Sequence, residues 1–148
     1  NDPTRREDEA SLRRSHLAIN ALIDREVQRG IAPARIVLMG FSQGCAMALM
    51  TGLRYPQALG GIIALSGYPP LSQHTQAERH PANQATPIFM AHGEHDDVVL
   101  MSRGMAARDQ LQQWGHRVEW HDYRMEHSLC LEEVQDINQW LLKEIQAA

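Results

Sequence analysis

The sequence predicts an α/β fold in which a mostly parallel sheet carries helices on both faces. Four short segments of strand length, 35–39, 61–65, 87–91 and 117–123, alternate along the chain with segments of helical periodicity. The first three of these segments are nearly uninterrupted apolar runs, which is typical of parallel strands that are buried on both faces. We therefore expect βαβ units rather than hairpins.

Composition and charge limit what the protein can be. The chain has 148 residues, of which 43% are hydrophobic, enough for one domain with a core. Its 14 basic and 18 acidic residues form no long run of one sign, which argues against nucleic-acid binding. No apolar stretch is long enough to span a membrane, and because the first residues lack the pattern of a signal peptide, we expect none. We expect Cys45 and Cys130 to be reduced and the protein to be cytoplasmic.

The first predicted element is a helix. Thr4 followed by Glu7 has the spacing of a capping box. Apolar positions then repeat at helical intervals as far as Val27, and Gly30 and Pro33 indicate the end of the helix. The strand 35–39 follows directly.

The remaining elements alternate in the same way. A helix at 43–54 and a strand at 61–65 precede the polar segment 67–86, which contains several prolines and is predicted to be irregular. Irregular segments of this length often cover a functional site. After the strand 87–91, a helix is expected to end at Gly115, before the strand 117–123. An apolar stripe from Cys130 to Ile145 predicts a last amphipathic helix, for which Ser128 is the candidate N-cap.

The stretch GFSQG, residues 40–44, lies between a predicted strand and a predicted helix, which is the context of a nucleophile elbow. We expect the bend to expose the Ser42 hydroxyl at the carboxyl edge of the sheet. Side chains at Gly40 and Gly44 would collide with their surroundings, and the Gln43 N–H, at a helix N-terminus, is a candidate oxyanion donor. Alternatively, Ser42 only caps the helix.

A serine nucleophile needs a base and an acid to orient that base. In this kind of fold they follow in the order serine, acid, histidine, each on a loop after a strand. Three acids, Glu94, Asp96 and Asp97, follow the strand 87–91, and spacing alone does not choose among them. His127 follows the strand 117–123 and is the candidate base.

Three other hypotheses are weaker. His92 and His95 beside Asp96 suggest a metal site, but no pattern such as HExxH accompanies them. A nucleotide-binding protein of flavodoxin type would need a glycine-rich phosphate loop, and GFSQG lacks that spacing. A binding module on a hydrolase fold would be expected to lack one of the three catalytic residue types, and all three are present.

Four motifs in this order, GFSQGCAMAL, ALSGY, AHGEHDDVV and MEHSLC, resemble those of the carboxylesterase and acyl-protein thioesterase family of α/β-hydrolases. The resemblance implies that residues 1–148 are the C-terminal part of a single α/β-hydrolase domain that needs no cofactor. It puts the nucleophile at Ser42, the acid at Asp96 and the base at His127, and so chooses among the three candidate acids.

The resemblance also implies a reaction. It is the hydrolysis of carboxylic esters with short-to-medium acyl groups through an acyl-enzyme, with acyl-protein thioesters or lysophospholipids as alternative substrates. Four residues either line an apolar acyl pocket or only pack the fold: Tyr68, Leu71, Val98 and Val99.

Two features depart from the family pattern. Leu100 stands where the family usually has a proline, and no counterpart is found for the strands and HGxG-type loop that precede the first helix and carry the second oxyanion donor. We therefore expect an N-terminal segment of the same protein to complete the fold. Residues 1–148 alone are expected to be poorly soluble and nearly inactive, because one missing oxyanion donor costs ~10²–10³ in rate. A homodimer is kept as a hypothesis.

Overall fold

The computed structural model describes the backbone of residues 3–147 and the side chains of residues 8–145. Its sheet has the strand order β1-β2-β3-β4, and every neighbouring pair is parallel. The strands are β1 (Val37–Phe41), β2 (Gly61–Leu65), β3 (Ile88–Gly93) and β4 (Val118–Tyr123). The predicted parallel α/β architecture is confirmed, with the predicted bounds of β2 matched.

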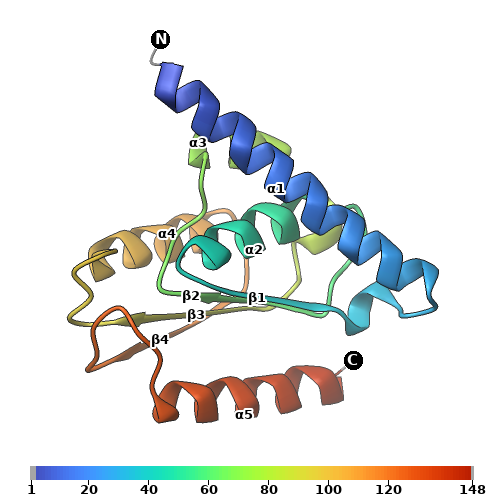
Figure 1. The fold of residues 1–148 in the computed structure, drawn as a ribbon. Helices are drawn as coiled ribbons and strands as arrows, with labels where there is room; N and C mark the ends of the chain where they lie inside the picture. Colours follow the sequence, from blue (N-terminus) through green and yellow to red (C-terminus); the bar gives the residue numbers. More distant parts are fainter. Residues whose placement is uncertain (1–2, 148) are drawn as a thin grey trace.

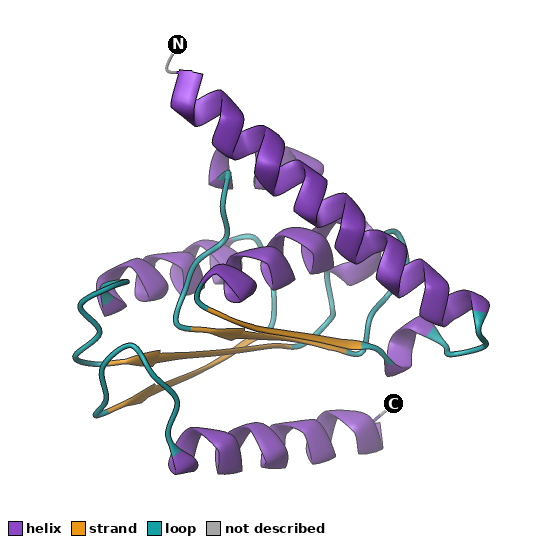
Figure 2. Ribbon diagram, in the orientation of Figure 1, coloured by secondary structure: helices purple, strands orange, loops and turns teal. Residues whose placement is uncertain are grey.

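Helices cover both faces of this sheet. They are α1 (Pro3–Gln28), α2 (Gln43–Arg54), α3 (Ser72–Glu78), α4 (Met101–Gln113) and α5 (Leu131–Ala147). Figure 1 shows α2 and α4 on one face, α5 on the opposite face, and α1 lying across the outside of α2. Coloured by element type, the same view separates the sheet from the helical layers above and below it (Figure 2). None of the helices in the described part of the chain is apolar enough over a sufficient length to cross a bilayer.

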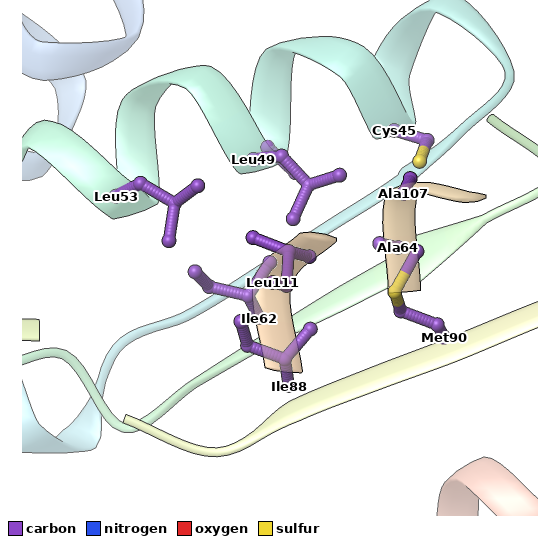
Figure 3. Close-up of a cluster of buried hydrophobic side chains, with 10 residues drawn as sticks. Cys45, Leu49, Leu53, Ile62, Ala64, Ile88, Met90, Ala107 and Leu111 are labelled. Atoms are coloured by element: carbon purple, nitrogen blue, oxygen red, sulfur yellow. The ribbon is translucent and has the colours of Figure 1, made fainter. Parts of the chain in front are cut away.

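The core has one layer on each face of the sheet. Between the sheet and α2, Leu49 and Leu53 contact Ile62 and Ile88, with Leu111 of α4 beside them (Figure 3). On the other face, Phe89 packs edge-on against Trp140 of α5, with ring centroids 5.8 Å apart. Each fully buried side chain of this size contributes about 1.5–3 kcal/mol of hydrophobic free energy. The two layers fix the carboxyl ends of β1, β2 and β3 relative to one another.

The first strand differs from the prediction. It begins at Val37 rather than at residue 35, because Pro33–Arg35 forms a 3₁₀ turn. It is also not buried on both faces, since the Met39 side chain is 64% exposed. In the described residues β1 pairs only with β2, so its outer edge is open.

The segment 67–86 was predicted to be irregular, and this is wrong in part. It contains α3 and a 3₁₀ turn at Pro81–Asn83. The Asn83 side chain is buried, accepts a hydrogen bond from the Leu59 N–H at 2.8 Å and donates to the Tyr55 carbonyl at 2.9 Å. These bonds fix the segment to the rest of the fold. The predicted Thr4–Glu7 capping box involves side chains outside the described residues.

Candidate active site

Ser42 lies at the sharp junction between β1 and α2. Its backbone has φ 58° and ψ −115°, a strained conformation for a residue with a side chain. Two backbone hydrogen bonds hold it there: the Ser42 N–H donates to the Leu65 carbonyl at 2.8 Å, and the Ser42 carbonyl accepts from the Ala46 N–H at 3.2 Å. The strain is therefore maintained by β2 on one side and by α2 on the other.

The two glycines of GFSQG have different surroundings. A Cβ at Gly40 would lie 2.0 Å from the Gly44 carbonyl oxygen, so the predicted collision is confirmed there. A Cβ at Gly44 would meet nothing within 4 Å in the described residues, so the prediction of a collision there is wrong. The reason is that Gly44 faces a groove beside the open β1 edge. The groove has a volume of about 580 Å³ and is also lined by Met39, Gln43 and Met47.

A third glycine, Gly67, is also required, although its place in the sequence did not predict this role. It follows Ser66, a buried residue with φ 57° at the end of β2. A Cβ at Gly67 would be 2.9 Å from the Ser42 carbonyl oxygen and 3.0 Å from the Cys45 sulfur. Only a glycine lets this turn pass so close to the elbow. The motif ALSGY contains Gly67, but the sequence does not show that Ser42 and Cys45 lie against it.

Asp96 lies on the loop after β3, and its side chain is fully buried. Its Oδ1 accepts hydrogen bonds from the backbone N–H groups of Val98, at 2.9 Å, and Val99, at 2.8 Å. Burial acts to raise the pKa of Asp96, but the hydrogen bonds from His127, Val99 and Val98 outweigh it and hold the pKa below its ordinary value. Asp96 is therefore ionised at neutral pH.

The structure brings His127 between Asp96 and Ser42. The Nδ1 of His127 is 2.7 Å from Oδ2 of Asp96, and its Nε2 is 2.9 Å from Oγ of Ser42. Because the ionised carboxylate can only accept, Nδ1–H is the donor, and Nε2 is left to accept the serine proton. Glu94 and Asp97, the other candidate acids, are exposed, and the carboxylate that bonds to His127 is that of Asp96.

The loop that carries His127 is bound along its length to the loop that carries Asp96. The Glu94 N–H donates to the Tyr123 carbonyl at 2.8 Å, and the His95 N–H donates to the Met125 carbonyl at 3.0 Å. Gly93 allows this contact, because a Cβ there would be 2.3 Å from the Glu126 carbonyl oxygen. The acid and the base are thus positioned as one unit.

One further contact completes the surroundings of the base. The Phe41 ring packs against the imidazole of His127, with centroids 4.7 Å apart, a contact that the sequence pattern did not predict. The prediction that Ser128 caps α5 is wrong. The Val134 N–H donates to the Cys130 carbonyl, which makes Cys130 the cap, because the turn after His127 continues for two more residues.

The candidate oxyanion donor lies on the open side of Ser42. Gln43 is the first residue of α2 and is exposed. The first N–H groups of a helix have no acceptor within the helix and carry partial positive charge. The Gln43 N–H can therefore meet a negative oxygen next to Ser42, at the end of the groove lined by Met39 and Gly44.

The predicted acyl-pocket residues occupy different positions. Tyr68 lines a cleft of about 320 Å³ between its loop and α4, where its hydroxyl accepts a hydrogen bond from Arg103 at 3.1 Å. Leu71 has φ 53° and precedes α3. Val98 is 68% exposed, and its neighbour Val99 is half-buried. What the sequence did not reveal is that both valines bind Asp96 through their backbone.

Comparisons with known proteins identify a family and several relatives. Residues 1–145 match the phospholipase/carboxylesterase family. The chain is 45% identical to acyl-protein thioesterase 1 of Neurospora crassa over 145 residues, which is 95% of this chain and 59% of the relative. It is 40% identical to acyl-protein thioesterase 1 of Yarrowia lipolytica over 130 residues, 86% of this chain and 57% of the relative. The chain thus spans less than two thirds of the length of these curated relatives.

A solved structure gives the same result for the fold. The crystal structure of Arabidopsis thaliana SOBER1 superposes with a TM-score of 0.88 at 32% identity. The superposition covers 93% of this chain and 66% of SOBER1.

Proposed function

This chain belongs to the phospholipase/carboxylesterase family of α/β-hydrolases, and we propose that it carries the catalytic triad of a serine hydrolase that cleaves carboxylic esters. The observation that carries the proposal is the continuous hydrogen-bond chain from Ser42 through His127 to Asp96. Its order, tautomer and burial are those that a general base needs to activate a serine.

In the proposed reaction, Nε2 of His127 takes the proton of Ser42 as Oγ attacks the carbonyl carbon of the ester. Asp96 keeps the imidazole oriented and stabilises the imidazolium that forms. The tetrahedral oxyanion is bound by the Gln43 N–H. His127 then protonates the leaving alcohol or thiol, and a water molecule, activated by the same base, hydrolyses the acyl-enzyme.

We further propose that another segment of the same protein, N-terminal to these residues, completes this domain. The open edge of β1, the exposed Met39 and the unfilled space beside Gly44 support the proposal. An exposed strand edge beside an apolar groove is a surface that natural proteins cover. A segment in this groove would also lie next to the Gln43 N–H, where a second oxyanion donor is needed.

The substrate is proposed at the level of its chemistry. Short-to-medium acyl esters are the first candidate, and the candidate contacts for the acyl group are Tyr68, Leu71, Val98 and Val99. Thioesters are the second candidate, since the relatives from Neurospora and Yarrowia are named acyl-protein thioesterases. We propose a cytoplasmic location, which two unpaired cysteines, Cys45 and Cys130, support.

Labelling with a fluorophosphonate tests the proposal directly, because the reagent reacts with an activated serine. The complete protein that contains these residues is expected to be labelled, and Ser42→Ala is expected to abolish labelling. Ser128→Ala is the matched control, since this exposed serine lies next to His127 and should leave labelling unchanged. Labelling of Ser42→Ala at the original rate, or no labelling of the unaltered protein, would contradict the proposal.

Kinetics then choose between the substrates. We expect kcat/KM to be measurable for oxygen esters of short and medium acyl chains and for S-acyl peptides of the same chain lengths. A preference of tenfold or more for the thioesters would favour the thioesterase candidate. The opposite preference would favour oxygen esters as the substrates.

A further inference from the structure

We propose that His92 is a positioning residue, which holds the loop 96–99 in the conformation that Asp96 needs in order to orient His127. The inference rests on the proposed function. His92 lies on the same side of Ser42 as Asp96 and His127, but it makes no hydrogen bond to Ser42 or His127. The resemblance to the family gives it no role.

His92 binds the far end of the loop 96–99, which we call the acid loop because it carries Asp96. It lies in β3, its side chain is 1% exposed, and its Nε2 is 2.7 Å from the Val99 carbonyl oxygen. A carbonyl can only accept, so Nε2 carries the proton and donates it. The same Nε2 lies 3.4 Å from Oδ2 of Asp96, the oxygen that receives the His127 hydrogen bond.

Val99 is thereby held at both of its backbone polar groups. Its N–H donates to Oδ1 of Asp96 at 2.8 Å, and its carbonyl accepts from His92. Without the second bond, the loop would be held mainly by the carboxylate that it is meant to position. Little else holds its tip, because Asp97 and Val98 are exposed.

His92 is itself rigidly packed. Its ring stacks on that of Trp120, with centroids 6.4 Å apart and 15° between the planes. On the α4 side, a Cβ at Gly104 would be 2.6 Å from Nδ1 of His92, so the helix backbone approaches the ring closely. Trp120 in turn donates a hydrogen bond to Asp122 at 2.9 Å. Because the His92 ring is fixed in this way, its hydrogen bond to Val99 can hold the acid loop in one position relative to the sheet.

A matched set of substitutions separates the donor from the ring. His92→Phe keeps a flat ring and removes the donor. His92→Gln has an amide nitrogen about as far from the backbone as Nε2 and can restore the bond to Val99. His92→Asn has the same amide on a shorter side chain and cannot reach. If His92→Phe does not fold, the Asn and Gln variants still supply the contrast.

In the complete protein we expect His92→Phe and His92→Asn to lower kcat about tenfold, the scale of one lost hydrogen bond, with KM unchanged. The acidic limb of the pH–rate profile should move to lower pH, because a poorly placed Asp96 stabilises the His127 imidazolium less. His92→Gln should restore both properties. A purely structural histidine would change thermal stability and leave the pH profile in place.

Proton NMR gives a readout that needs no turnover. The hydrogen-bonded Nδ1 proton of His127 should give a strongly deshielded signal in the unaltered protein and in His92→Gln. It should weaken or move upfield in His92→Phe and His92→Asn. An unchanged signal and an unchanged pH limb in the variants that lack the donor would overturn the inference. Failure of the proposed function would instead appear as absent fluorophosphonate labelling of the unaltered protein, with the NMR test still valid.

Discussion

The described residues enclose one side of Ser42 and leave the other side open. On one side, Asp96 and His127 are buried or half-buried, hydrogen-bonded to each other and joined through the backbone of their loops. On the other side, Gln43 and Gly44 lie at the surface, beside a groove of about 580 Å³. The proposed proton transfer therefore involves only described residues, whereas stabilisation of the oxyanion is proposed to need another segment.

The difference has a structural origin. The closed side is formed by the loops after β3 and β4, which are neighbours in the sheet and share a pattern of backbone hydrogen bonds. The open side belongs to β1, whose outer edge has no partner among the described residues. A site at the boundary between a paired and an unpaired strand can be complete for one part of the reaction and incomplete for the other.

The largest expected effect comes from Asp96→Asn, which disrupts the closed side. Oδ1 of Asp96 accepts two N–H groups, so an amide would place its oxygen there and turn its NH₂ toward Nδ1 of His127. The imidazole would then carry its proton on Nε2 and could not accept the proton of Ser42. We expect kcat to fall by about 10⁴, the size known for a wrong histidine tautomer in a triad.

Ester turnover and fluorophosphonate labelling measure this effect, and Asp97→Asn serves as the control. Asp97 is the adjacent residue, has the same chemistry and is exposed, so its substitution should leave the rate within twofold. Comparable losses in both variants would mean that the acid is not specifically Asp96.

The second prediction concerns the contact between the loop of Asp96 and the loop of His127. Gly93→Ala would place a Cβ 2.3 Å from the Glu126 carbonyl oxygen and 2.4 Å from that of Met125, and both are backbone atoms. The loops must separate, so we expect a loss of about 3 kcal/mol in stability, at the upper end of overpacking, together with a lower kcat. Urea denaturation measures the first and turnover the second. A fully stable and active Gly93→Ala would show that the contact does not position His127.

The third prediction concerns a buried carboxyl group in α5, the helix that follows the loop of His127. Glu133, in the first turn of α5, is fully buried, and neither of its oxygens has a hydrogen-bond partner of normal geometry among the described residues. Burial raises the pKa of Glu133 from 4.5 to about 7, and the backbone N–H of Cys130 opposes the rise. The folded protein thus holds this proton more tightly than the unfolded chain.

The stability that this carboxyl contributes is therefore complete below pH 4.5 and is lost as the pH rises to 7. At about 1.4 kcal/mol per pKa unit, the loss is at most about 3 kcal/mol. We expect Glu133→Gln to be more stable relative to the unaltered protein at pH 8 than at pH 5, as measured by urea denaturation at both values. Glu132→Gln, at the neighbouring exposed position, should show no such pH dependence.

The sequence predicted the fold well where local pattern and tertiary position agree. The apolar run GIIAL matches β2 residue for residue, because that strand is buried on both faces. The helix α3 was missed because its sequence, SQHTQAE, has no apolar stripe. It is held by tertiary ion pairs instead: Glu78 contacts Arg54 at 2.8 Å and Arg13 at 2.9 Å.

The residues of the site, too, could be predicted from the sequence only in part. The order of serine, acid and histidine on successive loops was enough to select Ser42 and His127, and the structure brings them together. The contributions of His92, Gly67 and Gly93 depend on which loops touch, and no spacing in the chain records that. Gly44 was misjudged for the opposite reason, since its pattern suggested a contact that the described residues do not make.

The smallest expected effect is also the sharpest test of the open side. In the described residues, Gly44→Ala adds a methyl group that meets nothing, and alanine favours a helix over glycine by up to about 1 kcal/mol. If nothing packs against Gly44 in the complete protein, the substitution should therefore raise its stability, measured by urea denaturation, by up to that amount. In the complete protein, a segment packed into the groove would leave no room for the methyl group, so the same substitution should reduce stability and the rate of labelling. A gain of up to about 1 kcal/mol in the complete protein would mean that nothing packs against Gly44, and the second oxyanion donor would have to be sought elsewhere.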